Sequence, residues 1–197
     1  MKRKSISSSL LIIFLSILFA TIGTCFSVFA YQKTKIEVSE VKVVSVDGID
    51  VFDDEELTKK SSRLILSKME LGLKPATGEI DSESQIPSTI NDKGTSEGYY
   101  STVFVRTNLG IKISVVDVIV EGGQDDISAN EERENIFVSI KDIRGTTKSL
   151  ENETTKLVEL TNINGTQKLT FFIWLGALAD DVLEGAKISF TIKFEQI

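Results

Sequence analysis

The sequence predicts an all-β protein, an antiparallel two-sheet sandwich, that follows a hydrophobic N-terminal segment. Three observations predict this fold. Apolar and polar residues alternate with a period of two along most of the chain from Tyr31 onward, β-branched residues dominate these runs, and no long amphipathic helical pattern competes with them. The 197 residues are enough for one domain with an ordinary hydrophobic core.

Residues 1–30 have the order of a secretory signal peptide. A basic head at 2–4 precedes an apolar run at 10–22, and Val28 and Ala30 stand at the third and first positions before the expected cut. A positive head, an apolar middle and a small residue before the cut are what a signal peptidase recognises. We therefore expect cleavage between Ala30 and Tyr31, which leaves a secreted or cell-surface domain at 31–197.

Two other fates of this segment stay open. Residues 9–30 are long enough to cross a bilayer uncleaved, with the basic head in the cytoplasm, so the protein would be anchored in the plasma membrane through this segment alone. Cys25 is a candidate lipidation site, although Thr24 is a poor residue before such a cysteine. In each case the rest of the chain is exported.

The clearest strands are the last two. Residues 187–194 alternate strictly, so that one face is apolar (Ile188 to Phe194) and the other is polar, as in a half-buried strand. Residues 169–175 contain one polar residue, Thr170, which predicts a central strand buried on both faces.

Shorter alternating runs predict the remaining strands. They lie at 36–46, 49–52, 102–106, 111–120, 136–140 and 157–160. The alternation changes phase within 111–120, which predicts a β-bulge. A turn signal at Asp47-Gly48 suggests that 49–52 pairs back on the strand before it.

Two stretches interrupt the strand pattern. Residues 53–73 open with four acidic residues and a leucine, as the first turn of a helix does, so we expect a short helix followed by a strand. Residues 75–98 hold both prolines and many small polar residues, which predicts a long polar loop.

The composition excludes familiar chemistry. The chain has no histidine, which removes His-based general bases, catalytic triads and His-ligated zinc. It has one cysteine and a net charge of −7, so a disulfide framework and a basic nucleic-acid-binding face are also excluded. No nucleotide-binding or hydrolase motif is present. We therefore expect no enzyme activity, no catalytic residues and no cofactor.

Acidic residues gather at two expected turns, Asp125-Asp126 and Asp180-Asp181 with Glu184. Neither turn has the alternating oxygen ligands of a calcium loop, so solvated charges are the simpler explanation and no metal site is assigned.

Three segments together resemble the TasA/camelysin-like family of secreted proteins of Gram-positive bacteria. They are Leu71-Gly72-Leu73-Lys74-Pro75, the strand–Asn–Gly–strand unit around Asn108-Leu109-Gly110, and the closing pair that joins 172–176 to 184–190. The resemblance implies a jelly-roll-like sandwich without an enzymatic site. It also implies processing by a signal peptidase and assembly into extracellular matrix fibres, in which the segment after the cut adds as a strand to the next subunit.

On this resemblance, the assembly strand lies within 35–46. Its β-forming residues, next to the freed terminus, would complete the sheet of a second copy or of another exported matrix subunit. The candidate residues are Lys35, Ile36, Val38, Val41 and Val43. Two alternatives remain: the segment pairs within its own domain, or the protein is a membrane-tethered extracellular binding or accessory domain.

Overall fold

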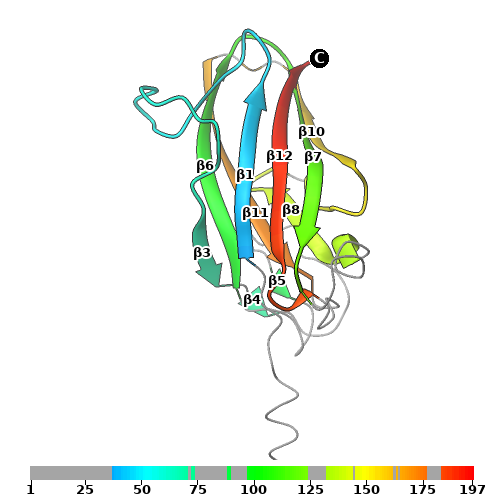
Figure 1. Cartoon of the computed structure of the whole chain (residues 1–197). Coiled ribbons are helices and arrows are strands. Elements are labelled where there is room, and N and C mark those ends of the chain that lie inside the picture. Colours follow the sequence, from blue (N-terminus) through cyan, green and yellow to red (C-terminus); the bar gives the residue numbers. More distant parts are fainter. Residues whose placement is uncertain are drawn as a thin grey trace, which may run out of the picture. The chain divides into compact units, whose positions relative to one another are not determined.

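The computed structural model describes residues 37–70, 72–73, 88–89, 97–123, 132–143, 145–161, 163, 165–176 and 183–197 (Figure 1). Residues 33–197 form a compact unit of their own. The predicted signal or anchor segment, 1–30, lies outside the described residues.

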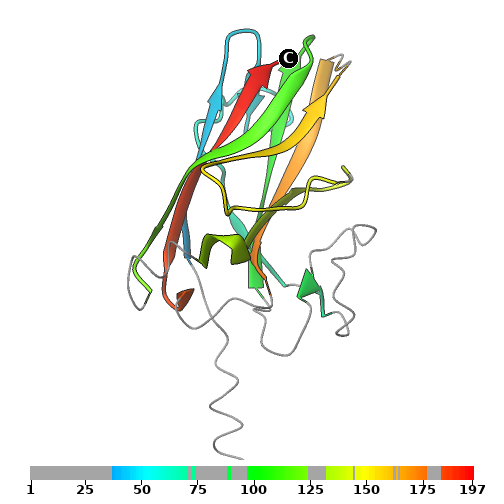
Figure 2. The ribbon, with the colours of Figure 1, turned by 90° about the vertical axis from the view of Figure 1, so that its right-hand side faces the viewer.

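Two β-sheets pack face to face, as Figure 2 shows, which confirms the all-β two-sheet sandwich. The four-stranded sheet has the order β1-β12-β7-β10: β1 (Glu37–Ser45), β12 (Lys187–Gln196), β7 (Ile111–Glu121) and β10 (Thr154–Leu160). The six-stranded sheet has the order β2-β6-β11-β8-β9, with β3 also on β6: β2 (Asp50–Phe52), β6 (Glu97–Thr107), β11 (Gly165–Leu175), β8 (Ile136–Ile140), β9 (Lys148–Ser149) and β3 (Ser67–Glu70).

Three short elements lie outside these two sheets. The strands β4 (Gly72–Leu73) and β5 (Ser88–Thr89) pair with each other, and the 3-10 helix η1 (Glu132–Asn135) leads into β8. The β5 strand, together with the first residues of β6, lies inside the range predicted as one long loop. That prediction was therefore wrong for these residues, and 74–87 and 90–96 lie outside the described residues.

The core lies between the sheets and follows the predicted alternation. The apolar face of β12 is buried at 2% exposure or less, and the inward residues of β11 are buried as deeply. The ring of Phe171 on β11 meets the ring of Phe194 on β12 edge to face, with centroids 6.4 Å apart. Because β11 and β12 belong to different sheets, this pair joins the two layers.

The predicted β-bulge is present in β7. Ser189 of β12 is opposite Ile119 and Thr191 is opposite Val116, so two β7 residues oppose the single residue between them. One of the two, Asp117, has a positive φ of 54°. The extra residue changes which side chains face inward, and this explains the phase change in the sequence.

The predicted return of 49–52 onto the preceding strand is wrong. The β2 strand pairs with β6 in the other sheet, so the Asp47-Gly48 turn carries the chain from one sheet to the other. The sandwich also departs from a purely antiparallel arrangement, because β1 pairs in parallel with β12. A local alternation pattern contains no information on either choice of partner.

The predicted helix at the start of 53–73 is also wrong, whereas the strand after it is present as β3. The carboxylate of Asp54 accepts hydrogen bonds from the backbone N–H groups of Thr58 and Lys59, and Leu57 has a positive φ of 56°. A side chain that binds nearby backbone groups competes with helix formation. The segment forms a succession of turns instead.

Candidate functional site

The structure places three of the predicted assembly residues on β1. Val38, Val41 and Val43 all point into the core, with 7% exposure or less. Lys35 and Ile36, together with the predicted cleavage site at Ala30 and Tyr31, lie outside the described residues. In this structure β1 thus completes its own domain, which was the alternative left open above.

A parallel ladder to β12 holds β1 along its length. Val38 lies opposite Ile188, and the register continues to Ser45 opposite Phe194, with one irregularity after Val38. Further hydrogen bonds extend the ladder at both ends: the Glu37 N–H donates to the Ala186 carbonyl over 2.9 Å, and the Val46 N–H donates to the Phe194 carbonyl over 3.2 Å.

A second segment lies against the other edge of β1. We call residues 53–66 the strap, because they leave β2, project beside β1 in Figure 1 and return to β3. The Val43 N–H donates to the Ser62 carbonyl over 2.9 Å, and the Leu64 N–H donates to the Val41 carbonyl over 2.8 Å. Leu64 is buried in the core at 5% exposure, whereas Arg63 and Ile65 beside it are exposed.

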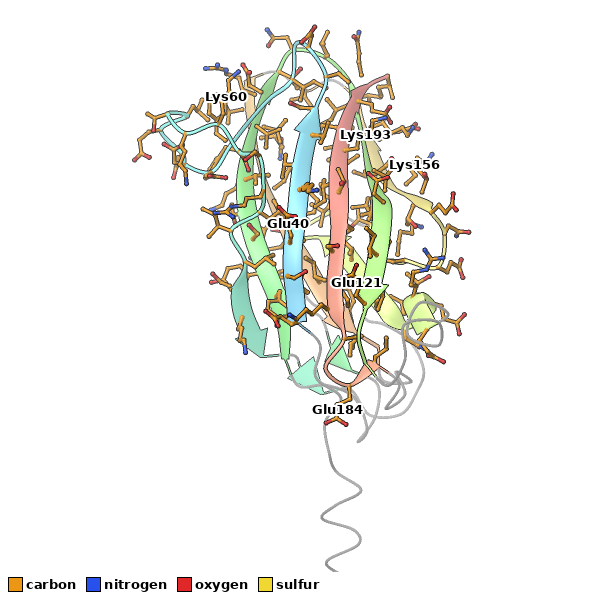
Figure 3. The ribbon with its side chains drawn as sticks, in the orientation of Figure 1. Glu40, Lys60, Glu121, Lys156, Glu184 and Lys193 are labelled. Atoms are coloured by element: carbon orange, nitrogen blue, oxygen red, sulfur yellow. The ribbon has the colours of Figure 1, made fainter. Side chains whose placement is uncertain are left out.

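The base of the strap is fixed to β2 and to its own turns. The Asp53 N–H donates to the Lys59 carbonyl over 2.9 Å, and the Ser61 N–H donates to the Val51 carbonyl over 2.8 Å. Lys60, labelled in Figure 3, lies 2.7 Å from the Asp50 carboxylate. Hydrogen bonds from Lys60 and then from Arg106 hold the pKa of Asp50 below its ordinary value.

A tight turn connects β1 to β2. The Ile49 N–H donates to the Val46 carbonyl over 3.2 Å, and Gly48 has a φ of 87°, which favours glycine. The Thr107 hydroxyl donates to the Gly48 carbonyl over 3.0 Å. The turn is therefore anchored to β6, the strand that carries Thr107.

The far edge of each sheet carries features that hinder pairing with another chain. On β10, the register slips at Leu157, and Lys156 and Glu159 form an exposed ion pair at 3.2 Å. Beyond β8, the Thr146 hydroxyl accepts from the Ile140 N–H over 2.9 Å and donates to the Ile140 carbonyl over 3.0 Å. Bulges, charges and side chains that occupy backbone groups are common protections of sheet edges.

The outer faces of the two sheets differ in character. The outer face of the four-stranded sheet, turned toward the viewer in Figure 3, carries charged residues such as Glu40, Glu121 and Lys193. The outer face of the six-stranded sheet carries aromatic residues instead, in neighbouring register positions on four strands. These are Phe52, Tyr100, Phe104, Phe137, Phe172 and Trp174.

Part of this aromatic face is open and part is covered. Tyr100 is 39% exposed, whereas Trp174 is buried and stacks on Phe137 with ring centroids 5.7 Å apart. The Lys168 ammonium lies over the Phe104 ring at 5.9 Å, and none of the described residues forms an ion pair with it.

In the described part of the chain, no three side chains of the metal-ligating types come together, and no helix is long and apolar enough to cross a membrane. Glu184 is exposed at the turn before β12, as Figure 3 shows. The acidic residues 125–126 and 180–181 lie outside the described residues.

Sequence reasoning identified β1 but missed the strap that lies against it. The strap residues that contact β1 are Ser62, Arg63 and Leu64, of which only Leu64 is apolar and buried. A single buried leucine among exposed neighbours produces no periodic pattern. No protein-family model matches the chain, and no match is found among curated proteins.

Proposed function

We propose that residues 31–197 are a non-enzymatic structural protein of the cell surface or extracellular matrix, whose copies join by exchanging β1. Cleavage between Ala30 and Tyr31 would free the segment that leads into this strand. The partner is a second copy or another exported matrix subunit. The resemblance to the TasA/camelysin-like family, with its jelly-roll-like sandwich, implies strand addition to the next subunit, and exchange of β1 is the form of strand addition that we propose here.

The position of β1 carries the proposal. It is the first strand that the structure describes, it lies at a sheet edge, and its three valines fill core positions between the two sheets. An identical β1 from a neighbouring molecule would make the same contacts with β12. The balance between the closed monomer and the exchanged assembly then depends on the turn at 46–49 and on protein concentration.

The other sheet edges favour exchange over simple edge addition. The slipped register of β10 and the Thr146 hydroxyl at Ile140 both hinder the pairing of an added strand. Exchange of β1 does not need a free edge, because the incoming strand takes a place that the outgoing strand has left.

A cysteine pair across β1 and β12 tests the proposal. Lys42 and Thr191 are register partners on the outer face. Neighbouring strands lie about 4.8 Å apart, within the range that a disulfide spans. In the 31–197 fragment carrying Lys42→Cys and Thr191→Cys, oxidation after assembly should link chains into a covalent ladder. Disulfides confined within single chains of an assembled sample would contradict strand exchange, and so would a fragment that stays monomeric at high concentration.

The matched control is a pair that exchange leaves within one chain. Lys112 on β7 and Glu195 on β12 are also register partners on the outer face. The double variant Lys112→Cys and Glu195→Cys should form disulfides within single chains before and after assembly. A covalent ladder from this pair would show that the disulfides do not report the exchange of β1.

A membrane-tethered extracellular binding domain is the second candidate, and the aromatic face of the six-stranded sheet favours it. Residues 9–30 would then remain as the anchor. The mass of the native chain separates the two candidates: a chain that begins at Tyr31 supports the matrix protein, whereas one that keeps Met1 or Lys2 supports the tethered domain.

The chemistry of this face suggests an acidic polysaccharide as the ligand of such a domain. The exposed ring of Tyr100 offers a surface for sugar C–H groups, and Lys168 is a cation without an ion-pair partner among the described residues. Tyr100→Ala and Lys168→Glu should each reduce retention on an immobilised polyuronate. Val44→Ala and Lys156→Glu, on the four-stranded sheet, are the matched controls, and equal losses in all four variants would contradict this second candidate.

A further inference from the structure

We infer that the strap, residues 53–66, is a latch that controls how fast β1 leaves and enters the sandwich. This inference rests on the proposed exchange of β1. It concerns a different contact, the one between β1 and the strap, and it has its own test.

The strap grips β1 at one place. Two backbone hydrogen bonds, from Val43 N–H to the Ser62 carbonyl and from Leu64 N–H to the Val41 carbonyl, enclose the bridge between Lys42 and Arg63. Leu64 is the buried anchor of this contact. Lifting this short stretch would therefore break two backbone hydrogen bonds and expose one leucine.

The rest of the strap is held independently of β1. The Asp54 carboxylate accepts hydrogen bonds from the side chain of Thr58 and from the backbone of Thr58 and Lys59. The ion pair between Lys59 and Asp53, at 3.0 Å, closes the same turn. These bonds are internal to the strap, so its grip on β1 can open while its base stays folded.

The latch affects both the departure of β1 from the sheet and the entry of a β1 from another chain. Since β1 lies between the strap and β12, the strap must open before β1 can leave the sheet. An incoming β1 also needs an open strap, and it presents the same backbone groups to Ser62 and Leu64 once it is seated. The strap would therefore slow the first exchange and then hold the assembled strand in place.

Hydrogen exchange of the monomeric 31–197 fragment measures the latch without assembly. The fragment contains the whole compact unit, 33–197. Leu64→Ala should speed exchange of the Val43 amide by about tenfold or more, because the buried anchor is lost. Ile65→Ala, which truncates an exposed neighbour of similar size, should leave this rate within about twofold. The Phe171 amide, on the central strand β11, reports whether the variant has unfolded as a whole.

A disulfide between β1 and the strap tests whether the latch slows assembly. Lys42→Cys and Arg63→Cys occupy a non-hydrogen-bonded antiparallel pair, which suits a disulfide. The oxidised variant should assemble at least about tenfold more slowly than the same protein under reducing agent. This variant also keeps Leu64, so it tests the latch even if Leu64→Ala fails to fold.

The outcomes separate the latch from the proposed function. Faster Val43 exchange in Leu64→Ala supports the control of β1 release by the strap, and this measurement on the monomer does not depend on assembly. Equal assembly rates for the oxidised and reduced disulfide variants would overturn the latch, whereas strand exchange itself is tested separately by the cysteine pair at 42 and 191. An unchanged Val43 rate in a folded Leu64→Ala variant would also overturn it.

Discussion

At the scale of single residues, the two faces of β11 show that the position of a side chain decides how much it contributes to the stability of the fold. Phe171 points inward, is fully buried and meets Phe194 edge to face across the two sheets. Phe172, the next residue, points to the outer face and is only half-buried. The same side chain therefore has a structural role at one position and a surface role at the next.

Replacing these two phenylalanines tests that difference. Phe171→Ala should lower the free energy of unfolding by about 3–5 kcal/mol, because it removes a buried ring and leaves a cavity. Phe172→Ala should lower it by about 1 kcal/mol, since less area leaves the water on folding. Urea unfolding of the 31–197 fragment measures both values, and equal losses would contradict the assignment of faces.

The strap also contains a residue that makes the stability of the fold sensitive to acid. Hydrogen bonds from the Thr58 side chain, then from the Lys59 backbone, hold the pKa of Asp54 below its ordinary value. A carboxylate with a lowered folded pKa stabilises the fold fully above its unfolded pKa, about 3.9. That stabilisation is lost as the pH falls through the folded pKa.

We therefore expect Asp54→Asn to flatten the acid end of the stability profile. The loss of stability on going from pH 6 to about pH 3 should be smaller in the variant than in the parent protein. Urea midpoints at the two pH values measure this difference. Glu56→Gln, at an exposed position in the same turn, serves as the control, and identical profiles for parent and Asp54→Asn would contradict the prediction.

At the scale of elements, the end of β8 depends on one side chain in place of a strand partner. The Thr146 hydroxyl bonds both the N–H and the carbonyl of Ile140, and it is 1% exposed. Thr146→Val keeps the shape and leaves these backbone groups without that partner. We expect a loss of about 1–3 kcal/mol in unfolding free energy, measured by urea denaturation. Thr147→Val, at the half-buried neighbour, should change it by less than about 1 kcal/mol.

The elements also show what the sequence could and could not predict. The strands β11 and β12 and a bulge within 111–120 were predicted, because each of them leaves a local pattern of apolar and polar residues in the sequence. The parallel partner of β1 and the transfer of β2 to the other sheet were missed. Both depend on contacts between residues far apart in the chain, and many partners suit the same alternation.

The candidate site likewise has a part that was predicted from the sequence and a part that was not. Val38, Val41 and Val43 were predicted as residues of an assembly strand, and the structure buries all three in the core of their own domain. The turns of the strap were mistaken for a helix, because an acidic opening suits both a helix start and a side chain that caps backbone groups. The sequence alone does not distinguish the two uses of Asp54.

At the scale of the whole molecule, β1 is an edge strand whose ladder to β12 and three buried valines complete the sandwich. A fragment that begins at Val46 lacks the strand that carries Val38, Val41 and Val43, so its core is open along β12. We expect this fragment to bind a peptide of residues 37–45 and to gain thermal stability from it.

A peptide with Val41→Asp and Val43→Asp is the control for that experiment, because charges cannot replace buried valines. Calorimetry of the fragment with each peptide gives the answer. Equal stabilisation by both peptides, or by neither one when the fragment is folded, would contradict a replaceable β1.

The parallel pairing of β1 with β12 has a mechanical consequence. Glu37 lies beside Lys187, and the chain ends beyond the opposite end of this pair, as Figure 1 shows. Tension applied between the start of β1 and the C-terminus therefore pulls the two strands past each other along their length. The ladder bonds, which lie across the strands, share such a load and break together rather than one at a time. We expect a high unfolding force in this direction, a property that would suit the proposed matrix role.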